Sequence, residues 1–329
     1  MLPAVPRGGV TAEPVTLETV QRAAERVGRV ARRTPLEHSP ALSDAFGAPV
    51  HLKLECWQPT RSFKVRGAYN AISRLTAAER ARGIVTASAG NHGQAVALAA
   101  RELGARATVF LPADAPRTKQ DRIRSLGAEL RADAADYDTA ERSAQEYAAS
   151  AGAVFVHAYA DPAVISGQGT VALEIVEQLP DVEQVIVPVG GGYLITGVGT
   201  GLKALRPACR VTGVQSVETR AMYDAFRDGA AGDVVITPTL ADGLAGCTDE
   251  ATYRRARRVT DDLVLVEETD IADAIRVLYD QAGITAEGSA AVAAAAVLTG
   301  RITTRAVTAL IITCGNIDGA RLARILEDR

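Results

Sequence analysis

Short apolar or alternating runs are separated by longer amphipathic stretches through most of this sequence. The short runs, rich in β-branched residues, predict strands at 51–55, 83–88, 107–111, 153–156, 185–189, 211–215, 263–266 and 307–312. Apolar positions at helical spacing predict helices at 17–27, 94–103, 137–150, 163–178 and 194–205, and the alanine-rich stretch 290–298 indicates a buried helix. Thr16 is the expected N-cap of the first helix.

Strands that alternate with helices in this way are typical of doubly wound, mainly parallel sheets. Ligands of such folds lie at the C-terminal ends of the strands, on the loops that lead into helices. The sequence shows no repeat and no obvious linker, so we expect two α/β lobes that are interleaved along the chain.

Composition narrows the class of protein. The chain has 329 residues, with 36 Lys and Arg against 39 Asp and Glu, and a formal net charge of −3. This balance does not favour binding to nucleic acid or to an anionic membrane. No apolar run approaches the roughly 18 residues that span a bilayer. The first residues, MLPAVPRGG, lack the apolar core of a signal peptide, so we expect a cytoplasmic protein.

The cysteines do not indicate metal or redox chemistry. They stand at Cys56, Cys209, Cys247 and Cys314, far apart in the sequence, and no two have the CxxC spacing of a metal or redox site. A reducing compartment therefore suits the chain.

A lysine stands at the expected start of a helix in the segment SFKVRG, residues 62–67. The positive end of the helix dipole would lower the pKa of Lys64 there and favour its free amine. A free amine can form a Schiff base with an aldehyde. Taken alone, however, this pattern is more typical of a solvated lysine.

Two loops of small residues lie between an expected strand and an expected helix. They are SAGNHGQ at 88–94 and PVGGGY at 188–193, and their backbone N–H groups at a helix start would form an anion site. The second loop lacks the spacing of a P-loop and of a dinucleotide fingerprint. The alternative is that both loops merely turn the chain and cap helices. A third segment, TCGN at 313–316, places a hydroxyl after a strand, where it would either pair with a ring nitrogen or cap a helix.

Taken in order, six segments resemble the fold type II pyridoxal-phosphate enzymes, and within them the serine/threonine dehydratase branch. The segments are SFKVRGAYN (62–70), SAGNHGQAVA (88–97), PVGGGYLITG (188–197), TLADGLA (239–245), AEGSAA (286–291) and TCGNID (313–318). The resemblance implies a tryptophan synthase β-like fold with pyridoxal 5′-phosphate in the cleft between two lobes. In that fold 1–74 and 160–329 form the cofactor domain, and 75–159 form the small domain with the substrate loop.

The resemblance also implies a role for each matching residue. Lys64 would hold the cofactor covalently and act as a catalytic residue together with Glu287. The residues expected to contact the cofactor are Phe63, Lys64, Asn91, Gly190, Gly191, Gly192, Tyr193, Leu194 and Thr313. The residues expected to bind the substrate carboxylate are Ser88, Ala89, Gly90, Asn91 and His92.

The chain departs from this family at several positions. Tyr193 stands where a fourth glycine is usual, and a positive φ there would cost about 1 kcal/mol or more. Its ring either covers the cofactor or packs outward against the helices. Arg61 replaces another glycine, and it either meets a second substrate carboxylate or faces solvent.

Two further departures bear on the reaction and on metal binding. Ala89 replaces the serine that serves racemases as an acid on the second face of Cα, so racemisation is disfavoured. Gln215 and Ala221 replace the acidic ligands of the divalent cation found in several relatives. The loss of two carboxylates leaves too few hard oxygen ligands, so we expect no metal.

The resemblance implies a dehydratase that removes water from a β-hydroxy amino acid such as threonine or serine, giving a 2-oxo acid and ammonia. A serine racemase or a β-replacement synthase on the same scaffold is the alternative. A non-catalytic regulatory protein that binds the cofactor is a rival from another class, although such a protein has no need for Lys64. The only partner that we expect besides the amino-acid substrate is a second copy of the chain, in a homodimer.

Overall fold

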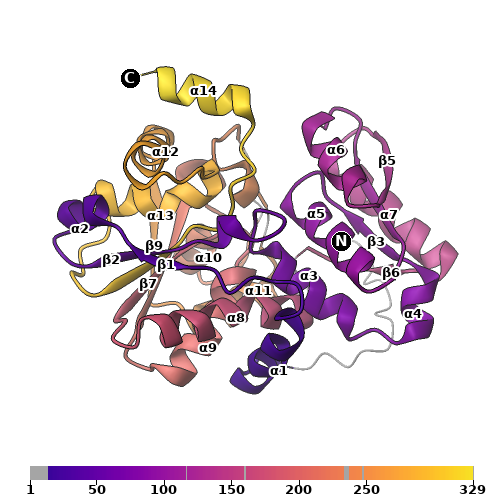
Figure 1. Cartoon of the computed structure of the whole chain (residues 1–329), viewed down its shortest axis with the longest axis horizontal. Helices are drawn as coiled ribbons and strands as arrows, with labels where there is room; N and C mark the ends of the chain where they lie inside the picture. Colours follow the sequence, from indigo (N-terminus) through magenta and orange to yellow (C-terminus); the bar gives the residue numbers. More distant parts are fainter. Residues whose placement is uncertain (1–13, 116, 159–160, 233–236, 247, 329) are drawn as a thin grey trace.

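The computed structural model describes residues 14–115, 117–158, 161–232, 237–246 and 248–328. Cys247 and the N-terminal segment discussed above lie outside these residues. Two lobes stand side by side, each with its own sheet (Figure 1). This arrangement confirms the expected α/β class with mainly parallel sheets.

The larger sheet has six strands in the order β1-β2-β10-β7-β8-β9. Their bounds are β1 Leu36–His38, β2 Val50–Lys53, β7 Gln184–Pro188, β8 Arg210–Ser216, β9 Asp262–Val266 and β10 Thr308–Ile311. Strand β1 pairs antiparallel with β2, and every other pairing is parallel. Strands β7, β8 and β10 in the middle of the sheet are almost entirely buried, because helices cover both faces of the sheet.

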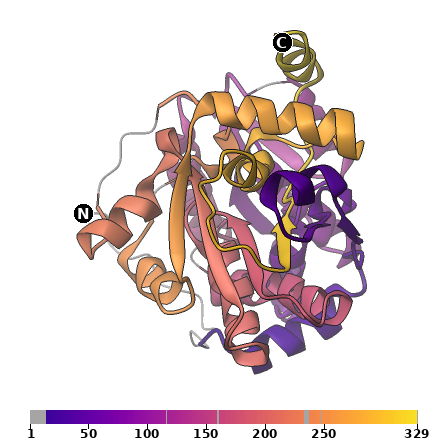
Figure 2. The ribbon, with the colours of Figure 1, turned by 90° about the vertical axis from the view of Figure 1, so that its left-hand side faces the viewer.

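Two helical layers enclose the larger sheet (Figures 1 and 2). One face packs against α2 Pro40–Phe46, α12 Glu268–Ala282 and α13 Gly288–Leu298. The other packs against α8 Pro162–Gln178, α9 Tyr193–Leu205, α10 Ala221–Asp228 and α11 Glu250–Arg257. Helix α1 Leu17–Val27 lies against α8, and α14 Gly319–Glu327 lies against α12. Thr16 caps α1 as expected.

The smaller sheet has four parallel strands in the order β5-β4-β3-β6. They are β3 Ile84–Ala87, β4 Ala107–Pro112, β5 Glu129–Ala134 and β6 Val154–Phe155. One face packs against α3 Lys64–Ser73 and α5 Asn91–Glu102, and the other packs against α7 Tyr137–Ala151. Helices α4 Ala77–Arg82 and α6 Arg117–Ser125 complete this lobe. Helix α3 also packs on α8, so it joins the two lobes.

Short 3-10 turns η1 Glu55–Trp57, η2 Val217–Thr219 and η3 Asp242–Leu244 complete the elements. None of the helices that the structure describes combines the length and the apolarity that a membrane span requires. The loops that follow β3, β7 and β10 contain the segments SAGNHGQ, PVGGGY and TCGN, in which the sequence predicts candidate binding residues. The helix that starts at Lys64 lies between the two sheets.

Candidate active site

The chain around Lys64 is attached to the end of β10. Ser62 forms an isolated antiparallel bridge with Cys314, and the backbone N–H of Phe63 donates to the carbonyl oxygen of Thr313 at 3.1 Å. Helix α3 begins at the next residue. The SFKVRG and TCGN segments, about 250 residues apart in sequence, therefore lie in direct contact.

Lys64 is half-buried, and its Nζ lies 5.2 Å from the centre of the Phe63 ring. Burial lowers the pKa of Lys64 from 10.5 to about 8, although the nearby Cys314 thiol opposes the shift. The direction agrees with the expectation from sequence, but the main cause is desolvation of the charged amine rather than the helix dipole. About one-tenth of this amine is therefore free at pH 7, far more than for an ordinary lysine.

Asn91 and Glu287 connect the two lobes. Asn91 Nδ2, at the start of α5, donates to Glu287 Oε1 at 3.0 Å, and the same oxygen accepts from the backbone N–H of Asn316 at 2.9 Å. Asn316 Nδ2 donates to Asn91 Oδ1 at 2.6 Å. Glu287 is buried, so its carboxylate depends on these donors.

The loop that leads into α5 is held by a hydrogen bond between its own backbone and the side chain of Ser88. The hydroxyl of Ser88 accepts from the backbone N–H of Gly90 at 3.1 Å, and Ser88, Ala89 and Gly90 are all half-buried. The ring of His92 turns inward, with Nε2 3.2 Å from the carbonyl oxygen of Val156. Burial, and then the charge of Lys64, lower the pKa of His92 to about 3, so the ring is neutral.

The glycine-rich loop after β7 has its positive φ at Gly192, a conformation that glycine adopts readily. Gly192 has a φ of +94° and is the N-cap of α9, whereas Tyr193 is the first helical residue. The positive φ that was considered for Tyr193 is therefore on the preceding glycine. Tyr193 is buried, and its hydroxyl donates to Asp249 Oδ2 at 3.4 Å. Thr248 Oγ1 donates to the carbonyl oxygen of Gly191 at 2.8 Å, which fixes the loop from the same side.

Arg61 is the residue that adopts the strained conformation. Its φ is +53°, and it is the single non-glycine residue with a positive φ in the described ranges. This conformation costs a non-glycine residue about 1–2 kcal/mol. The side chain is exposed, which agrees with the solvent-facing interpretation.

Thr313 and Cys314 are both buried beneath Lys64. Thr313 Oγ1 and Ser289 Oγ each lie 3.3 Å from Cys314 Sγ. Burial raises the pKa of the Cys314 thiol well above its usual value, so it stays protonated and unreactive.

Several residues at this site were not assigned a role from the sequence. Asn316 belongs to the TCGNID segment, and its place in that segment, just after a buried strand, was the available signal. Arg122 donates to Asn316 Oδ1 at 3.0 Å, and Lys119 approaches Asp242 at 3.5 Å across the two lobes. Lys119, Asp242 and Asn316 line a cavity of about 120 Å³ beside Glu287. Nothing in the local sequence of α6 indicated that its basic residues reach the larger lobe.

Gln215 and Ala221, which stand where relatives have acidic metal ligands, have structural roles in this chain. Gln215 is fully buried; its Nε2 donates to the carbonyl oxygen of Thr219 at 2.6 Å, and its Oε1 accepts from the backbone N–H of Tyr223 at 2.8 Å. Ala221 is buried at the start of α10. Among the described residues, no group of three or more His, Cys, Asp or Glu is arranged to hold a metal ion.

Comparison with known proteins agrees with this geometry. The sequence profile of the family described as pyridoxal-phosphate dependent enzymes matches residues 27–315. The L-threonine ammonia-lyase of Thermotoga maritima is 45% identical over 95% of this chain and 78% of its own length. The catabolic L-threonine dehydratase of Staphylococcus aureus is 37% identical over 96% of this chain and 93% of its own length.

Solved structures show the same fold. Maize serine racemase superposes with a TM-score of 0.91 at 31% identity, covering 96% of this chain and 98% of its own. The processed form of threonine deaminase isoform 2 from Solanum lycopersicum superposes with a TM-score of 0.90 at 34% identity, covering 99% of this chain and 93% of its own. The chain therefore belongs to the pyridoxal-phosphate dependent enzymes of fold type II.

Proposed function

We propose that this protein is an ammonia-lyase that converts L-threonine into 2-oxobutanoate and ammonia. The β-hydroxyl leaves as water, and the amino group is released as ammonia when water is taken up again. The observation that carries the proposal is the half-buried Lys64 amine, with a pKa of about 8, where the SFKVRG and TCGN segments meet. The names of the relatives at 37% and 45% identity support threonine as the substrate.

The residues around Lys64 fit pyridoxal phosphate. An amine that is partly free near neutral pH can capture the aldehyde of the cofactor. The backbone N–H groups of Gly190, Gly191, Gly192 and Leu194 make no hydrogen bond to another described residue. They stand at the N-terminus of α9, where a phosphate is stabilised. When bound, the cofactor supplies an electron-poor ring that stabilises negative charge at the substrate Cα.

The other cofactor contacts are proposed from their positions. Phe63 lies beside Lys64, and Asn91 of the smaller lobe bonds Glu287 of the larger one. The hydroxyl of Thr313 is neutral and buried, so it would leave a ring nitrogen unprotonated. A weaker electron sink favours prompt loss of a β-leaving group over a long-lived carbanion. Tyr193 completes this set at the head of α9, after the glycines.

Lys64 is the proposed general base. A base is most effective when its pKa lies near the working pH, because the free form is then populated while it still binds a proton strongly. The pKa of about 8 meets both conditions. Lys64 Nζ would therefore take the proton from the substrate Cα, and the neutral ring of His92 beside it would not compete for that proton.

The substrate carboxylate is proposed to bind the loop from Ser88 to His92. This loop ends at the N-terminus of α5, where backbone N–H groups and the helix dipole favour an anion. Ala89 and Gly90 leave the backbone accessible, while the ring of His92 is turned away from the loop surface. Glu287, bonded to Asn91, would lie at the other end of the substrate.

Serine racemase activity is the second candidate, because the maize serine racemase has the same fold at 31% identity. Racemisation needs an acid on the face of Cα opposite Lys64. Ala89 offers no hydroxyl there, so elimination is favoured over racemisation.

We also propose a two-domain division in which 75–159 forms the small domain and 1–74 with 160–329 forms the large domain. The four strands of the smaller sheet all lie between residues 84 and 155, which supports it. A cytoplasmic homodimer is proposed from the balanced composition and the family resemblance. Sedimentation of the purified protein at several concentrations, read as the molar mass in solution, tests the dimer.

The reaction is tested with a panel of L-threonine, L-serine, 3-hydroxyaspartate and phenylserine, each scored for ammonia and for 2-oxo acid. We expect the highest kcat/KM for L-threonine. A protein that carries the cofactor's visible absorption, yet releases no ammonia from any member of the panel, would instead be a non-catalytic relative.

A further inference from the structure

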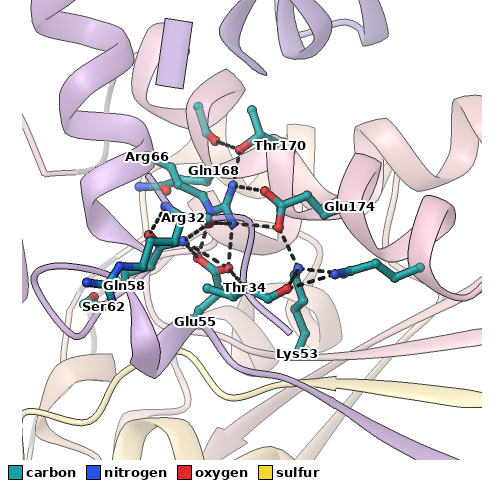
Figure 3. Close-up of polar contacts among 12 residues, drawn as sticks. Arg32, Thr34, Lys53, Glu55, Gln58, Ser62, Arg66, Gln168, Thr170 and Glu174 are labelled. Carbon is teal, nitrogen blue, oxygen red and sulfur yellow. Dashed lines mark hydrogen bonds and ion pairs between the residues drawn. The ribbon is translucent and has the colours of Figure 1, made fainter. Parts of the chain in front are cut away.

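Four charged residues lie together, three of them buried and one nearly so (Figure 3). They are Lys53 of β2, Glu55 of η1, Arg66 of α3 and Glu174 of α8, which we call the charge cluster. The side chains of Lys53, Glu55 and Arg66 are 0%, 0% and 1% exposed, and that of Glu174 is 17% exposed. None of them has a role in the reaction proposed above.

Arg66 is the centre of the charge cluster. Its Nε and Nη2 donate to the two oxygens of Glu55, each at 2.7 Å, in a bidentate pair. Nη1 donates to Glu174 Oε1 at 2.7 Å, and Nη2 approaches Glu174 Oε2 at 3.0 Å. Thr170 and the carbonyl oxygen of Arg32 accept the remaining bonds. All the donors of the guanidinium are therefore used, which fixes its position in three dimensions.

The rest of the charge cluster balances its charge. Lys53 Nζ donates to Glu174 Oε2 at 2.6 Å, to Gln178 Oε1 at 2.8 Å and to the carbonyl oxygen of Thr34 at 2.7 Å. Two cations and two anions sum to zero. Burial alone would raise the pKa of Glu55, but the charge and hydrogen bonds of Arg66 outweigh it and lower that pKa, so Glu55 stays ionised.

The charge cluster lies on the side of α3 opposite the reacting lysine. Residues two apart on an α-helix are rotated by about 200°, so Lys64 and Arg66 point in nearly opposite directions. The N-cap residue Phe63 makes no side-chain capping bond. The first turn of α3 therefore depends on other contacts for its orientation, and Arg66 provides the largest set of them.

Close packing between α3 and α8 reinforces this anchor. A Cβ on Gly67 would lie 2.4 Å from Gln168 Nε2, and a Cβ on Gly167 would lie 2.6 Å from the carbonyl oxygen of Arg66. The two backbones touch at these glycines, and the N–H of Gly67 also bonds Gln168 Oε1 at 3.2 Å. A small rotation of α3 would break these contacts and the salt bridges of Arg66 together.

Stability alone does not explain such a cluster, because well-packed apolar residues in place of a buried ion pair are often as stable or more so. The directional bonds do explain it, because they specify one rotation and one depth for α3. We propose that Arg66, held by Glu55 and Glu174, is a positioning residue that sets the direction and the burial of the Lys64 amine. This inference rests on the proposed role of Lys64.

The test compares three variants of the full-length chain. Arg66→Lys keeps the charge but loses the bidentate fork. Glu55→Gln combined with Arg66→Gln removes both charges and leaves Lys53 paired with Glu174. Asn70→Ala is the matched control, because Asn70 is a buried residue of the same helix whose amide bonds the carbonyl oxygen of Ala163 at the start of α8, at 2.7 Å.

Two readouts follow Lys64 itself. In the cofactor-free chain, mass spectrometry measures the rate at which a small amine-reactive reagent modifies Lys64 as a function of pH. The pH at which this rate is half of its maximum is the midpoint. In the loaded enzyme, kcat and KM for threonine are measured separately. We expect Arg66→Lys and the double variant to move the pH midpoint upward from about 8, because a loosened α3 exposes the amine to water. We expect kcat to fall by about 10–100-fold, with a much smaller change in KM.

The control separates positioning from general loosening. Asn70→Ala is expected to lower the melting temperature without moving the midpoint or kcat. If Arg66→Lys does not fold, the charge-balanced double variant decides the question. The proposal is overturned if the midpoint stays near 8 in the foldable variants, or if Asn70→Ala moves it equally. If instead Lys64→Ala retains turnover, the proposed function fails, whatever the Arg66 variants show.

Discussion

The amide of Asn91 donates a hydrogen bond of 3.0 Å to the carboxylate of Glu287, and this bond links the smaller lobe to the larger one beside Lys64. Asn91 starts α5 after the substrate loop, and Glu287 is the N-cap residue of α13. The two residues are 196 positions apart in sequence, yet Asn316 bonds to both. These three residues therefore join the two lobes.

Asn91→Asp is expected to destabilise the protein. It removes the N–H donor to Glu287 and places a second carboxylate within hydrogen-bond distance of the first. The loss should be about 1–3 kcal/mol of unfolding free energy, the usual cost of a buried acceptor without its partner. Adding Glu287→Gln reverses donor and acceptor, so the double variant should regain stability. Denaturant unfolding of the three proteins measures this. If the double variant is no more stable than Asn91→Asp alone, the two side chains do not interact as described.

The pKa of Lys64 leads to a specific pH dependence. An amine with a pKa of about 8 is about one-tenth free at pH 7 and mostly free at pH 9, whereas an ordinary lysine is still protonated at both. The rate at which the cofactor-free protein captures pyridoxal phosphate should therefore rise between pH 7 and 9 and then level off. Stopped-flow absorbance follows the capture. A rate that continues to rise steeply up to pH 10 would show that Lys64 has an ordinary pKa.

Chelation is expected to leave both turnover and melting temperature unchanged. Gln215 uses its amide to bond Thr219 and Tyr223, and Ala221 has no ligand atom, so this segment is held without an ion. The measurement compares enzyme dialysed against EDTA with enzyme supplemented with Mg²⁺ or Ca²⁺. A loss of activity in EDTA that either ion restores would contradict this account.

Elimination is expected without racemisation, because Ala89 has no proton to give to the second face of Cα. Chiral analysis of the remaining L-serine or L-threonine should show no D-enantiomer while ammonia accumulates. Ala89→Ser is expected to introduce measurable racemisation, because it supplies a hydroxyl at the loop. If the unaltered enzyme forms the D-enantiomer as fast as ammonia, another group is the acid.

The sequence was sufficient to predict most of the parallel strands and the loops at their C-terminal ends, because these strands are continuous apolar runs. It did not reveal β1, which is three residues long, or β5, an edge strand whose sequence ELRADA alternates charged and apolar residues without a continuous apolar run. The predicted strand 51–55 ends at Lys53 in the structure, and its last residue, Glu55, belongs to a 3-10 turn.

Contacts between distant segments were not accessible from local patterns. The bonds of Arg66 to Glu55 and Glu174 depend on the packing of three elements, although Arg66 lies inside the SFKVRG segment. The conformation of the glycine loop was also undetermined, because the sequence does not show which residue takes the positive φ. The structure assigns it to Gly192, which allows Tyr193 to start a helix.

Lys64 is proposed to hold the cofactor and to move the substrate proton. A comparison of the unaltered enzyme with Lys64→Ala tests both roles most directly. Loaded enzyme and Lys64→Ala are each treated with borohydride, digested and analysed by mass spectrometry, and ammonia release from L-threonine is measured on the same preparations. We predict that the unaltered enzyme carries reduced cofactor on Lys64, while Lys64→Ala carries none and loses turnover by about 10⁴-fold. Reduced cofactor on a different lysine, or full ammonia release by Lys64→Ala, would contradict the account.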